Sequence, residues 1–295
     1  MNNLTDFFDK NNKLPYFIAE ISSNHGRDLS RCLDFIDCAA DIGCDAVKFQ
    51  LFKIDNLFSP EALNFKKSLI DRKNWELPLS FLDSIKSKCI SRNIHFGCTP
   101  FYINAVADLL PYIDFYKIAS YELLWLDLIK TCAKTGKPLI LSTGMANISE
   151  IQSACEAVLC YSNIKPKLLH CTSTYPTPVT EANLSAINTI KINTNCDVGW
   201  SDHTVSSSVI NRAVHKWGAK IIEFHLDLDG LGDEFSSGHC WLPHQIEHLI
   251  SDIRLSFLSD GNHEKIPAQS ELVERDWRAD PSDGLRPLKS IRYNL

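Results

Sequence analysis

Short apolar runs alternate along this chain with longer stretches in which apolar residues recur at helical spacing. The runs are rich in β-branched and aromatic residues and predict strands at 16–22, 46–52, 94–101, 115–120, 138–144, 167–173, 197–203 and 220–226. The periodic stretches predict helices at 29–42, 81–90, 124–133, 148–159, 184–190, 205–217 and 244–258. Gly43, Gly136 and Gly218 each follow a predicted helix and precede a strand, as C-terminal caps do.

This alternation of strand and helix predicts an α/β fold. Eight strand–helix units in roughly 240 residues fit a closed parallel (β/α)8 barrel, the TIM barrel. The alternative is a doubly wound open sheet, which more often carries G-x-G-x-x-G after its first strand; the segment Glu20–Gly26 does not match that motif. We assign residues 1–258 to the barrel and residues 259–295, rich in charge, Pro and Gly, to an extended tail.

Polar residues gather where the predicted strands end. They are Glu20, Lys48, Gln50, Thr99, Lys117, Ser120, Ser142, Thr143, Thr172, Ser173, Ser201, Asp202, His203, Glu223 and His225. Barrel active sites are built at this end, because strand ends and the loops that follow them converge on one mouth. The long irregular connection at 53–79 is predicted to be a lid or a specificity element at that mouth.

Composition excludes several classes of protein. The net charge of −6 argues against a sequence-independent nucleic-acid binder, which needs a basic face. No apolar stretch is long enough to span a bilayer, and the N-terminus lacks the pattern of a secretory signal. Eleven cysteines, an odd number without framework spacing, indicate reduced thiols in a cytoplasmic protein.

Two histidines close consecutive strand-like runs. If neighbouring parallel strands carry His203 and His225, both imidazoles lie at the same end of the sheet and can share one divalent ion. Asp202 and Glu223 are near enough in sequence to bind the ion or to orient its ligands. The alternative is that each histidine is an ordinary hydrogen-bonded core residue.

Two lysines also end predicted strands and face the same cavity. Burying Lys48 and Lys117 is costly unless a counter-charge arrives, and a bound phosphate would supply one. The serine hydroxyls that could complete a phosphate site are those of Ser120, Ser142 and Ser201. Alternatively, Lys48 pairs with Glu20 and Lys117 with Glu122 as internal ion pairs. Schiff-base chemistry by one lysine is a further alternative.

Eight short strings match one known family in order and spacing. They are Ile18-Ala-Glu-Ile21 with Asn24-His25, Asp45-Ala-Val-Lys-Phe-Gln50, Thr99-Pro-Phe101, Lys117-Ile-Ala-Ser120, Leu141-Ser-Thr-Gly-Met145, His170-Cys-Thr-Ser-Thr-Tyr-Pro-Thr-Pro178, Gly199-Trp-Ser-Asp-His-Thr204 and Glu223-Phe-His225. From about residue 15 to 258 the chain resembles the sialic-acid (N-acetylneuraminate) synthase family, which includes synthases of legionaminic and pseudaminic acid.

The resemblance implies an activity. Members condense phosphoenolpyruvate with an open-chain N-acyl hexosamine, such as N-acetylmannosamine, to give a nonulosonic (sialic-type) acid and phosphate. It also implies a cytoplasmic homodimer that uses a divalent metal; we expect Mn²⁺, with Mg²⁺ or Co²⁺ as alternatives. Neither nucleic acid nor membrane is an expected partner.

The resemblance also assigns roles by position. The metal ligands match His203 and His225, and the residues expected at the reaction centre are Glu20, Lys48 and Lys117. The remaining substrate contacts match Ser142 and Ser201 for phosphoenolpyruvate, and Gln50, Thr99, Ser120, Glu122, Ser173 and Tyr175 for the sugar. Glu20 is either a base for the attacking water or an anchor for sugar hydroxyls.

Three departures from the family pattern concern the sugar. We expect the family's C-terminal antifreeze-like domain to be missing, so that Arg278 or Arg286 of the tail replaces its arginine or the acceptor differs. Ser173 stands where the family has asparagine, and the loop at 227–239 lacks the family's proline-containing pattern with its acceptor-binding aspartate. Three residues of that loop could substitute for the aspartate: Asp233, Glu234 and His239.

Other functions stay open at this stage. A synthase of the octulosonate or heptulosonate phosphate type would use a phosphorylated aldose and would need a second basic cluster at the mouth. A non-catalytic barrel subunit would have no reason to retain the lysines and histidines together. A metal-dependent sugar isomerase or lyase would bring more carboxylate ligands.

Overall fold

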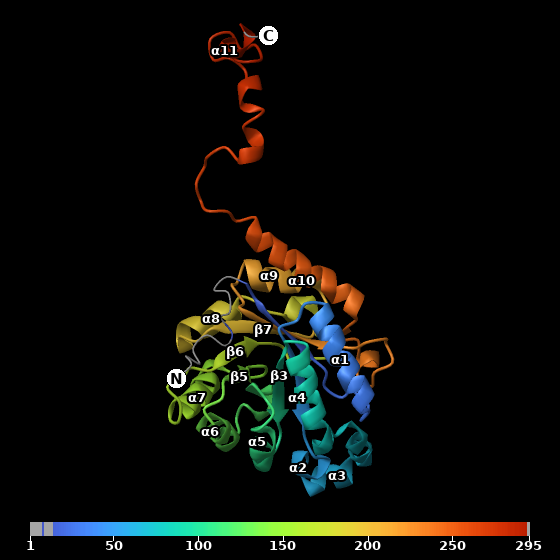
Figure 1. The fold of residues 1–295 in the computed structure, drawn as a ribbon. Helices are drawn as coiled ribbons and strands as arrows, with labels where there is room; N and C mark the ends of the chain where they lie inside the picture. The colour runs from blue at the N-terminus through green and yellow to red at the C-terminus, as the bar shows by residue number, and fades with distance from the viewer. Residues whose placement is uncertain (1–7, 9–13, 294–295) are drawn as a thin grey trace. The chain divides into compact units, whose positions relative to one another are not determined.

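The computed structural model describes residue 8 and residues 14–293, and within them eight parallel strands close into a barrel (Figure 1). Their bounds are β1 (Tyr16–Glu20), β2 (Ala46–Leu51), β3 (His95–Pro100), β4 (Phe115–Ile118), β5 (Leu139–Ser142), β6 (Lys167–His170), β7 (Val198–Asp202) and β8 (Ile221–Leu226). Each strand pairs with the next along the chain, and β1 pairs with β8 to close the ring. The short strand β9 (Cys240–Trp241) adds to β8. The predicted TIM barrel is confirmed.

Helices connect the strands in sequence. The main ones are α1 (Leu29–Asp41), α4 (Leu82–Ser91), α5 (Ile103–Leu109), α6 (Leu126–Lys134), α7 (Ile148–Leu159), α8 (Ala186–Thr194), α9 (Ser207–His215) and α10 (Pro243–Leu258). The sequence pattern did not predict α5, because seven residues make too few turns for a clear period. The connection at 53–79 is more ordered than predicted. It contains α2 (Ile54–Leu57), α3 (Pro60–Phe65) and the 3₁₀ segments η2 (Lys67–Trp75) and η3 (Leu79–Phe81).

Local sequence signals place several helix ends. The Asp28 carboxylate accepts the backbone N–H groups of Ser30 and Arg31 at the start of α1. Asn147 and Glu150 form a reciprocal capping box at the start of α7. After α1, Gly43 adopts a φ of 89°, a left-handed conformation that a side chain would strain, and this confirms its predicted capping role.

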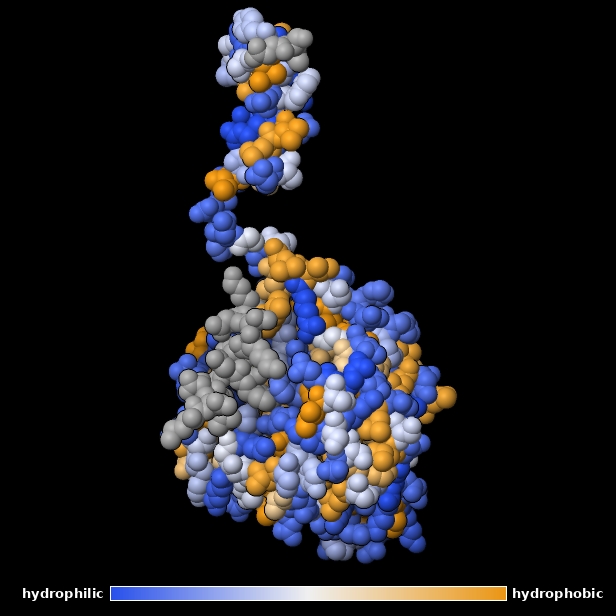
Figure 2. Space-filling view, viewed as in Figure 1, coloured by the Kyte–Doolittle hydropathy of each residue, from blue (hydrophilic) through white to orange (hydrophobic). Residues whose placement is uncertain are grey.

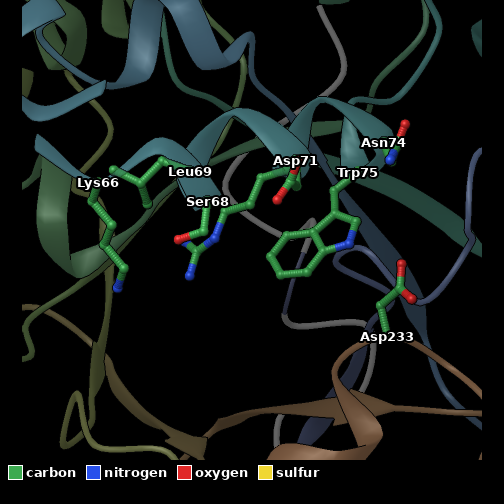
Figure 3. A pocket seen from close by; sticks show the side chains of 8 residues that line it. Lys66, Ser68, Leu69, Asp71, Asn74, Trp75 and Asp233 are labelled. Atoms are coloured by element: carbon green, nitrogen blue, oxygen red, sulfur yellow. The ribbon is translucent and has the colours of Figure 1, made fainter. Parts of the chain in front are cut away.

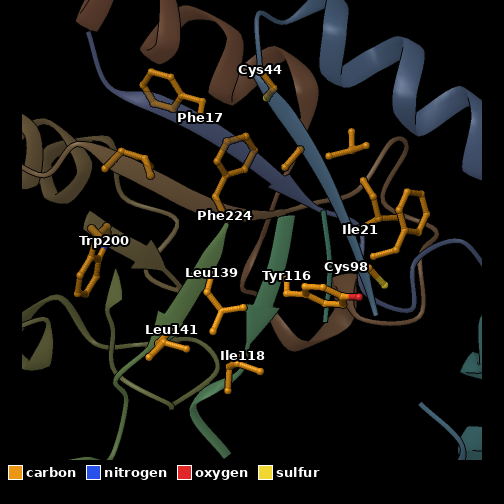
Figure 4. Packing of buried hydrophobic residues seen from close by; sticks show 14 of the residues in the cluster. Phe17, Ile21, Cys44, Cys98, Tyr116, Ile118, Leu139, Leu141, Trp200 and Phe224 are labelled. Atoms are coloured by element: carbon orange, nitrogen blue, oxygen red, sulfur yellow. The ribbon is translucent and has the colours of Figure 1, made fainter. Parts of the chain in front are cut away.

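The strands sort their side chains to two sides of the sheet. One set packs outward against the helices and includes Phe17, Trp200 and Phe224, which Figure 4 shows among their buried neighbours. The other set fills the barrel interior: Tyr16, Ile18, Ala46, Phe115, Ile140, Leu169 and Ile221. Because side chains alternate along a strand, the inward residues two positions further on are Glu20, Lys48, Lys117, Ser142, Cys171 and Glu223. An apolar layer therefore closes the barrel beneath a polar one.

The outer surface of the barrel is mixed in character. On the face drawn in Figure 2, hydrophilic residues cover much of the surface and apolar ones are scattered between them. Among the described residues, no helix combines the length and the apolar character that crossing a membrane requires.

The chain forms two compact units, Met1–Phe257 and Leu258–Leu295. The second unit has more local structure than the extended tail that the sequence predicts, with η7 (Gln269–Glu271), η8 (Arg275–Trp277) and α11 (Lys289–Arg292). Within it, the Asp280 carboxylate accepts the Ser282 N–H at 2.9 Å and the Lys289 N–H at 2.8 Å. A cavity of about 480 Å³ in this unit is lined by Glu274, Trp277, Arg278, Ala279 and Arg286.

Candidate active site

Four charged side chains meet inside the barrel at the carboxyl ends of the strands. Glu20, Lys48, Lys117 and Glu223 are 1%, 3%, 2% and 4% exposed. Lys48 forms an ion pair with Glu20, and its Nζ lies 3.9 Å from Glu223 Oε2. Lys117 Nζ lies 3.3 Å from Glu223 Oε1. The ion pair that sequence reasoning proposed for Lys48 is therefore present, whereas Lys117 pairs with Glu223 instead of Glu122.

On the β1–β3 side of this cluster, polar neighbours form hydrogen bonds with the ion pair of Lys48 and Glu20. Lys48 Nζ donates to Thr99 Oγ1 at 3.1 Å, and Gln50 Nε2 donates to Glu20 Oε1 at 2.8 Å. These residues come from three adjacent strands, and the register pairs Glu20 with Lys48 and Gln50 with Thr99. The barrel register thus brings four of the predicted site residues into one network.

On the opposite side, two serine hydroxyls form hydrogen bonds with the ion pair of Lys117 and Glu223. Lys117 Nζ donates to Ser142 Oγ at 2.6 Å, and Ser201 Oγ donates to Glu223 Oε1 at 3.0 Å. Among the described residues, the second oxygen of Glu223, Oε2, is buried without a hydrogen-bond partner. A buried carboxylate oxygen in that state indicates that a ligand or water completes the site.

The electrostatics of the cluster favour the ionised forms of Glu223 and Lys48. Burial acts to raise the pKa of Glu223, but Lys117 and Lys48 outweigh it and hold that pKa at about 2. Burial lowers the pKa of Lys117. For Lys48 burial acts in the same direction, yet the nearby Glu20 and Glu223 carboxylates raise its pKa overall. Both lysines are buried, and an incoming anion interacts more strongly with them there than it would in water.

A second group of predicted residues lies around Gly144. Its N–H donates to Ser120 Oγ at 3.0 Å, and Ser120 Oγ lies 3.2 Å from Cys171 Sγ. A Cβ at Gly144 would collide with Ser173 Oγ and would lie 2.8 Å from Ser120 Oγ. Only glycine fits between these hydroxyls without movement of its neighbours.

Two members of the predicted sugar side carry unsatisfied polar atoms. Within the part of the chain that is described, Glu122 Oε2 and Ser173 Oγ are buried without a hydrogen-bond partner. Burial raises the pKa of Glu122 to about 7. Both groups are available to bind a polar ligand.

The predicted histidine pair lies beside the charged cluster. The ring centroids of His203 and His225 are 5.5 Å apart, and the Tyr175 ring lies 4.2 Å from that of His203. Burial and the neighbouring His225 lower the pKa of His203 to about 3, so that its imidazole is neutral, as a metal ligand must be. Its Nδ1–H donates to the Thr172 carbonyl at 2.8 Å, so the lone pair of the neutral ring is on Nε2.

Two residues of the loop after β8 join His225. Glu234 Oε2 lies 3.1 Å from His225 Nδ1 and 3.6 Å from His239 Nε2. Four residues each offer one atom that could bind a metal, and these atoms all lie within 4.8 Å of one another. The residues are His225, Glu234, His239 and Cys240. His203 is not in this set, although its ring is close. Sequence reasoning named Glu234 and His239 only as substitutes for an acceptor contact.

This set of donors fits a divalent cation. Imidazole nitrogens and a carboxylate oxygen are the ligands of many catalytic metal sites. In the described structure, His239 Nδ1 is buried without a hydrogen-bond partner. The other ring nitrogen, His239 Nε2, lies 3.6 Å from Glu234 Oε2, so two imidazoles converge on one carboxylate oxygen, a donor set that a divalent ion can use.

Asp202 does not belong to the site, contrary to the prediction from its position. Its carboxylate accepts both indole N–H groups of Trp200 and Trp241 at 3.0 Å, and the Thr204 hydroxyl at 2.7 Å. These bonds use both oxygens on the outer, helix-facing side of β7. Asp202 is thus a structural residue, and the prediction that it binds or orients a metal is wrong.

A cavity of about 400 Å³ lies between η2 and the loop after β8. Its lining residues are Lys66, Ser68, Leu69, Asp71, Arg72, Asn74, Trp75 and Asp233. Figure 3 shows the Trp75 ring and the Asp233 carboxylate facing the same space from opposite elements. Asp233 directly precedes Glu234 in the loop after β8, so one lining residue of the cavity is the chain neighbour of a residue beside the imidazoles. Residues of the connection at 53–79 line this cavity, and its role as a lid or specificity element stays a prediction.

A TIM barrel with lysines, carboxylates and imidazoles gathered at the carboxyl ends of its strands is the architecture of a barrel enzyme. The sequence model of the NeuB family matches residues 35–265, and the chain belongs to that family.

Relatives agree with this assignment. The chain is 36% identical over 277 residues to the N,N'-diacetyllegionaminic acid synthase of Campylobacter jejuni, covering 88% of this chain and 81% of the relative. It is 35% identical over 228 residues to the pseudaminic acid synthase of the same species, covering 74% and 66%. A solved N-acetylneuraminic acid synthetase from Leptospira borgpetersenii aligns with a TM-score of 0.78 and 31% identity, covering 89% of this chain and 90% of that one.

Proposed function

We propose that this protein condenses phosphoenolpyruvate with an open-chain N-acyl hexosamine to give a nonulosonic acid and inorganic phosphate. The observation that carries the proposal is the buried cluster of Lys48 and Lys117 with Glu20 and Glu223 beside the imidazoles. The fold does not require such a cluster, and the synthases among the relatives support this reaction class.

The reaction balances with these two substrates and water. Carbon 3 of phosphoenolpyruvate attacks the aldehyde carbon, forming the new C–C bond, and the aldehyde oxygen takes up a proton. Water adds to carbon 2, loses a proton and gives a tetrahedral phosphohemiketal. The carbon 2 hydroxyl then loses its proton as the C–O bond to phosphate breaks, so that inorganic phosphate leaves and the 2-keto acid remains.

The lysines would bind phosphoenolpyruvate. In our proposal Lys48 and Lys117 offset the charge on the phosphate as the C–O bond breaks, with Ser142 and Ser201 as hydroxyl contacts. The phosphate would compete with Glu223 for Lys117. The distance from Lys117 Nζ to Glu223 Oε1, 3.3 Å, is longer than the 2.6 Å hydrogen bond from Lys117 Nζ to Ser142 Oγ. The Glu20 carboxylate, held by Gln50, would accept a proton from the attacking water or hold a sugar hydroxyl.

A divalent ion on the imidazoles of His203 and His225 would supply Lewis acidity toward the aldehyde. His203 is suited to this role because the Thr172 carbonyl orients its ring and burial keeps it neutral. The Tyr175 ring lies against the histidines and would limit access of water to them. We expect Mn²⁺, with Mg²⁺ or Co²⁺ as alternatives.

The acceptor would lie on the side of Ser120, Glu122 and Ser173, whose unsatisfied atoms can bind hydroxyl or amide groups. Its distal end would extend toward the cavity next to Asp233. That cavity contains two basic residues, Lys66 and Arg72, but also the carboxylates of Asp71 and Asp233. Because the charges balance, the lining favours a neutral hydroxylated end over the phosphate of an aldose phosphate.

A phosphate-release assay tests the function. Release from phosphoenolpyruvate should require both an N-acyl hexosamine and a divalent ion, and a panel of aldoses should identify the acceptor. His203→Ala and His225→Ala should each abolish turnover in a folded protein. Release that persists in chelator would refute the metal role, and release without any aldose would refute the condensation.

We further propose a homodimer that works in the cytoplasm. The structure describes all eleven cysteines as free thiols, which suits a reducing compartment. Light scattering on the purified protein measures the oligomeric state.

A further inference from the structure

The loop after β8 holds its carboxylate in a defined place. Glu234 Oε1 accepts the hydroxyls of Ser22 at 2.6 Å and Ser23 at 2.7 Å. The Glu234 N–H donates to Asn24 Oδ1 at 2.9 Å, and Asn24 Nδ2 donates to the Leu226 carbonyl at 3.0 Å. The loop after β1 therefore fixes one oxygen of Glu234 and leaves Oε2 directed at the imidazoles.

The backbone of the same loop is shaped to reach this position. A Cβ at Gly232 would collide with the side chains of Asp227 and Asn24, so glycine is required there. Asp227 Oδ2 accepts the N–H groups of Gly230 at 2.7 Å and Gly232 at 3.2 Å. Its Oδ1 accepts from Arg31 at 2.9 Å. This network of hydrogen bonds fixes the backbone conformation of the loop between β8 and Glu234.

The spacing of the three donors matches that of ligands on one ion. Nitrogen and oxygen ligands lie about 2.0–2.2 Å from a bound zinc ion, so two of them at ordinary angles are about 3–3.5 Å apart. Glu234 Oε2 is 3.1 Å from His225 Nδ1 and 3.6 Å from His239 Nε2, and the two imidazole centroids are 4.6 Å apart. Without a cation, the imidazoles of His225 and His239 share one carboxylate oxygen, Glu234 Oε2.

We propose that Glu234 and His239 are metal ligands in this protein and, with His225, form a two-imidazole, one-carboxylate site. The inference rests on the proposed function only in that it assumes a divalent ion. His203 lies at the edge of this set, with its ring centroid 5.5 Å from that of His225 and 6.4 Å from that of His239. Cys240 Sγ is already engaged by Asn24 Nδ2 at 3.5 Å and stays outside the site.

The donor set has a consequence for the choice of metal. Two imidazoles and one carboxylate are the ligands of catalytic zinc and of non-haem iron sites, whereas Mg²⁺ prefers oxygen ligands. We therefore expect Zn²⁺, Co²⁺ or Fe²⁺ to bind more tightly than Mg²⁺ or Mn²⁺. This differs from the Mn²⁺ that we expect from the resemblance to the synthase family.

Titration calorimetry of Zn²⁺ into metal-free protein, without substrates, tests the ligands directly. Outer-shell changes at metal sites typically cost about 10–100-fold in affinity, so loss of a ligand in His239→Ala or Glu234→Gln should weaken Zn²⁺ binding by at least about 100-fold. His170→Ala is the matched control: His170 is also buried, but its Nε2 faces the carbonyls of Ala182 and Asn183. It should bind Zn²⁺ as the wild type does.

The visible spectrum of bound Co²⁺ gives a second readout, because band position and intensity follow the ligand set. The spectrum should change in His239→Ala and stay unchanged in His170→Ala. Circular dichroism checks the fold of each variant, and His239→Gln replaces His239→Ala if the alanine variant unfolds.

The inference is overturned if His239→Ala binds Zn²⁺ within about threefold of wild type with an unchanged Co²⁺ spectrum while His225→Ala loses the metal. That result would leave the proposed function intact with a two-histidine site. A wild-type protein that binds no metal would overturn the inference and the metal role together. Phosphate release in chelator would then decide whether the condensation itself stands.

Discussion

Glu122 offers a sharp test of the electrostatics, because the residue is only 9% exposed and burial raises its pKa from 4.5 to about 7. The folded protein therefore holds a proton at Glu122 that the unfolded chain releases at lower pH. Its stabilising effect is fully present below pH 4.5 and is lost as the pH rises through 7. At about 1.4 kcal/mol per pH unit, this loss is about 3 kcal/mol.

The perturbation is Glu122→Gln, which keeps the shape of the side chain and removes its titration. Relative to the variant, the wild type should lose about 3 kcal/mol of unfolding free energy between pH 4.5 and pH 8. Urea unfolding of both proteins at pH 5 and pH 8, without substrates, measures the difference. Glu156→Gln, on the exposed face of α7, is the control and should show no such change with pH.

The reasoning would be refuted if the free energies of unfolding of Glu122→Gln and the wild type differed by the same amount at pH 5 and at pH 8. Such a result would mean that water or a cation reaches Glu122 and compensates for its burial. Addition of the acceptor is a further check, because a ligand that donates to the carboxylate should lower the pKa and shift the transition to lower pH.

Two further predictions concern the proposed phosphate site at Lys117 and the hydroxyl groups around Gly144. Lys117→Met should lower kcat for phosphate release by at least about 100-fold while the protein stays folded, because it removes a charge from the phosphate site; steady-state kinetics with near-normal kcat would contradict the role of Lys117. Gly144→Ala should destabilise the protein by about 1–3 kcal/mol and raise KM for the acceptor, because the new Cβ displaces Ser120 and Ser173. Unchanged thermal unfolding and unchanged KM would show that the contact between these hydroxyls and Gly144 relaxes freely.

The fold followed from local patterns. The eight strands and most helices were predicted from hydrophobic period alone, because each strand buries both faces and each helix buries one. The α5 helix was missed because it is too short to show a period, and η2 was hidden in a segment without apolar spacing. Signals that depend on a few neighbouring residues, such as the cap at Gly43, were reliable.

The inward face of the strands was equally predictable. Once the barrel is assumed, the two-residue period directs Glu20, Lys48 and Lys117 into its interior above an apolar layer. The order of β7 and β8 likewise brings His203 and His225 together. Strand register is dictated by which side chains must be buried, and that information is written in the sequence.

Tertiary structure alone decided the partners. Lys117 pairs with Glu223, four strands away in the chain, and the oxygens of Asp202 are used by Trp200 and Trp241. The sequence determined which residues end the strands, since that depends on periodicity. It could not determine how the loop after β8 carries Glu234 and His239 back to His225, because that course depends on contacts with residues more than 200 positions away.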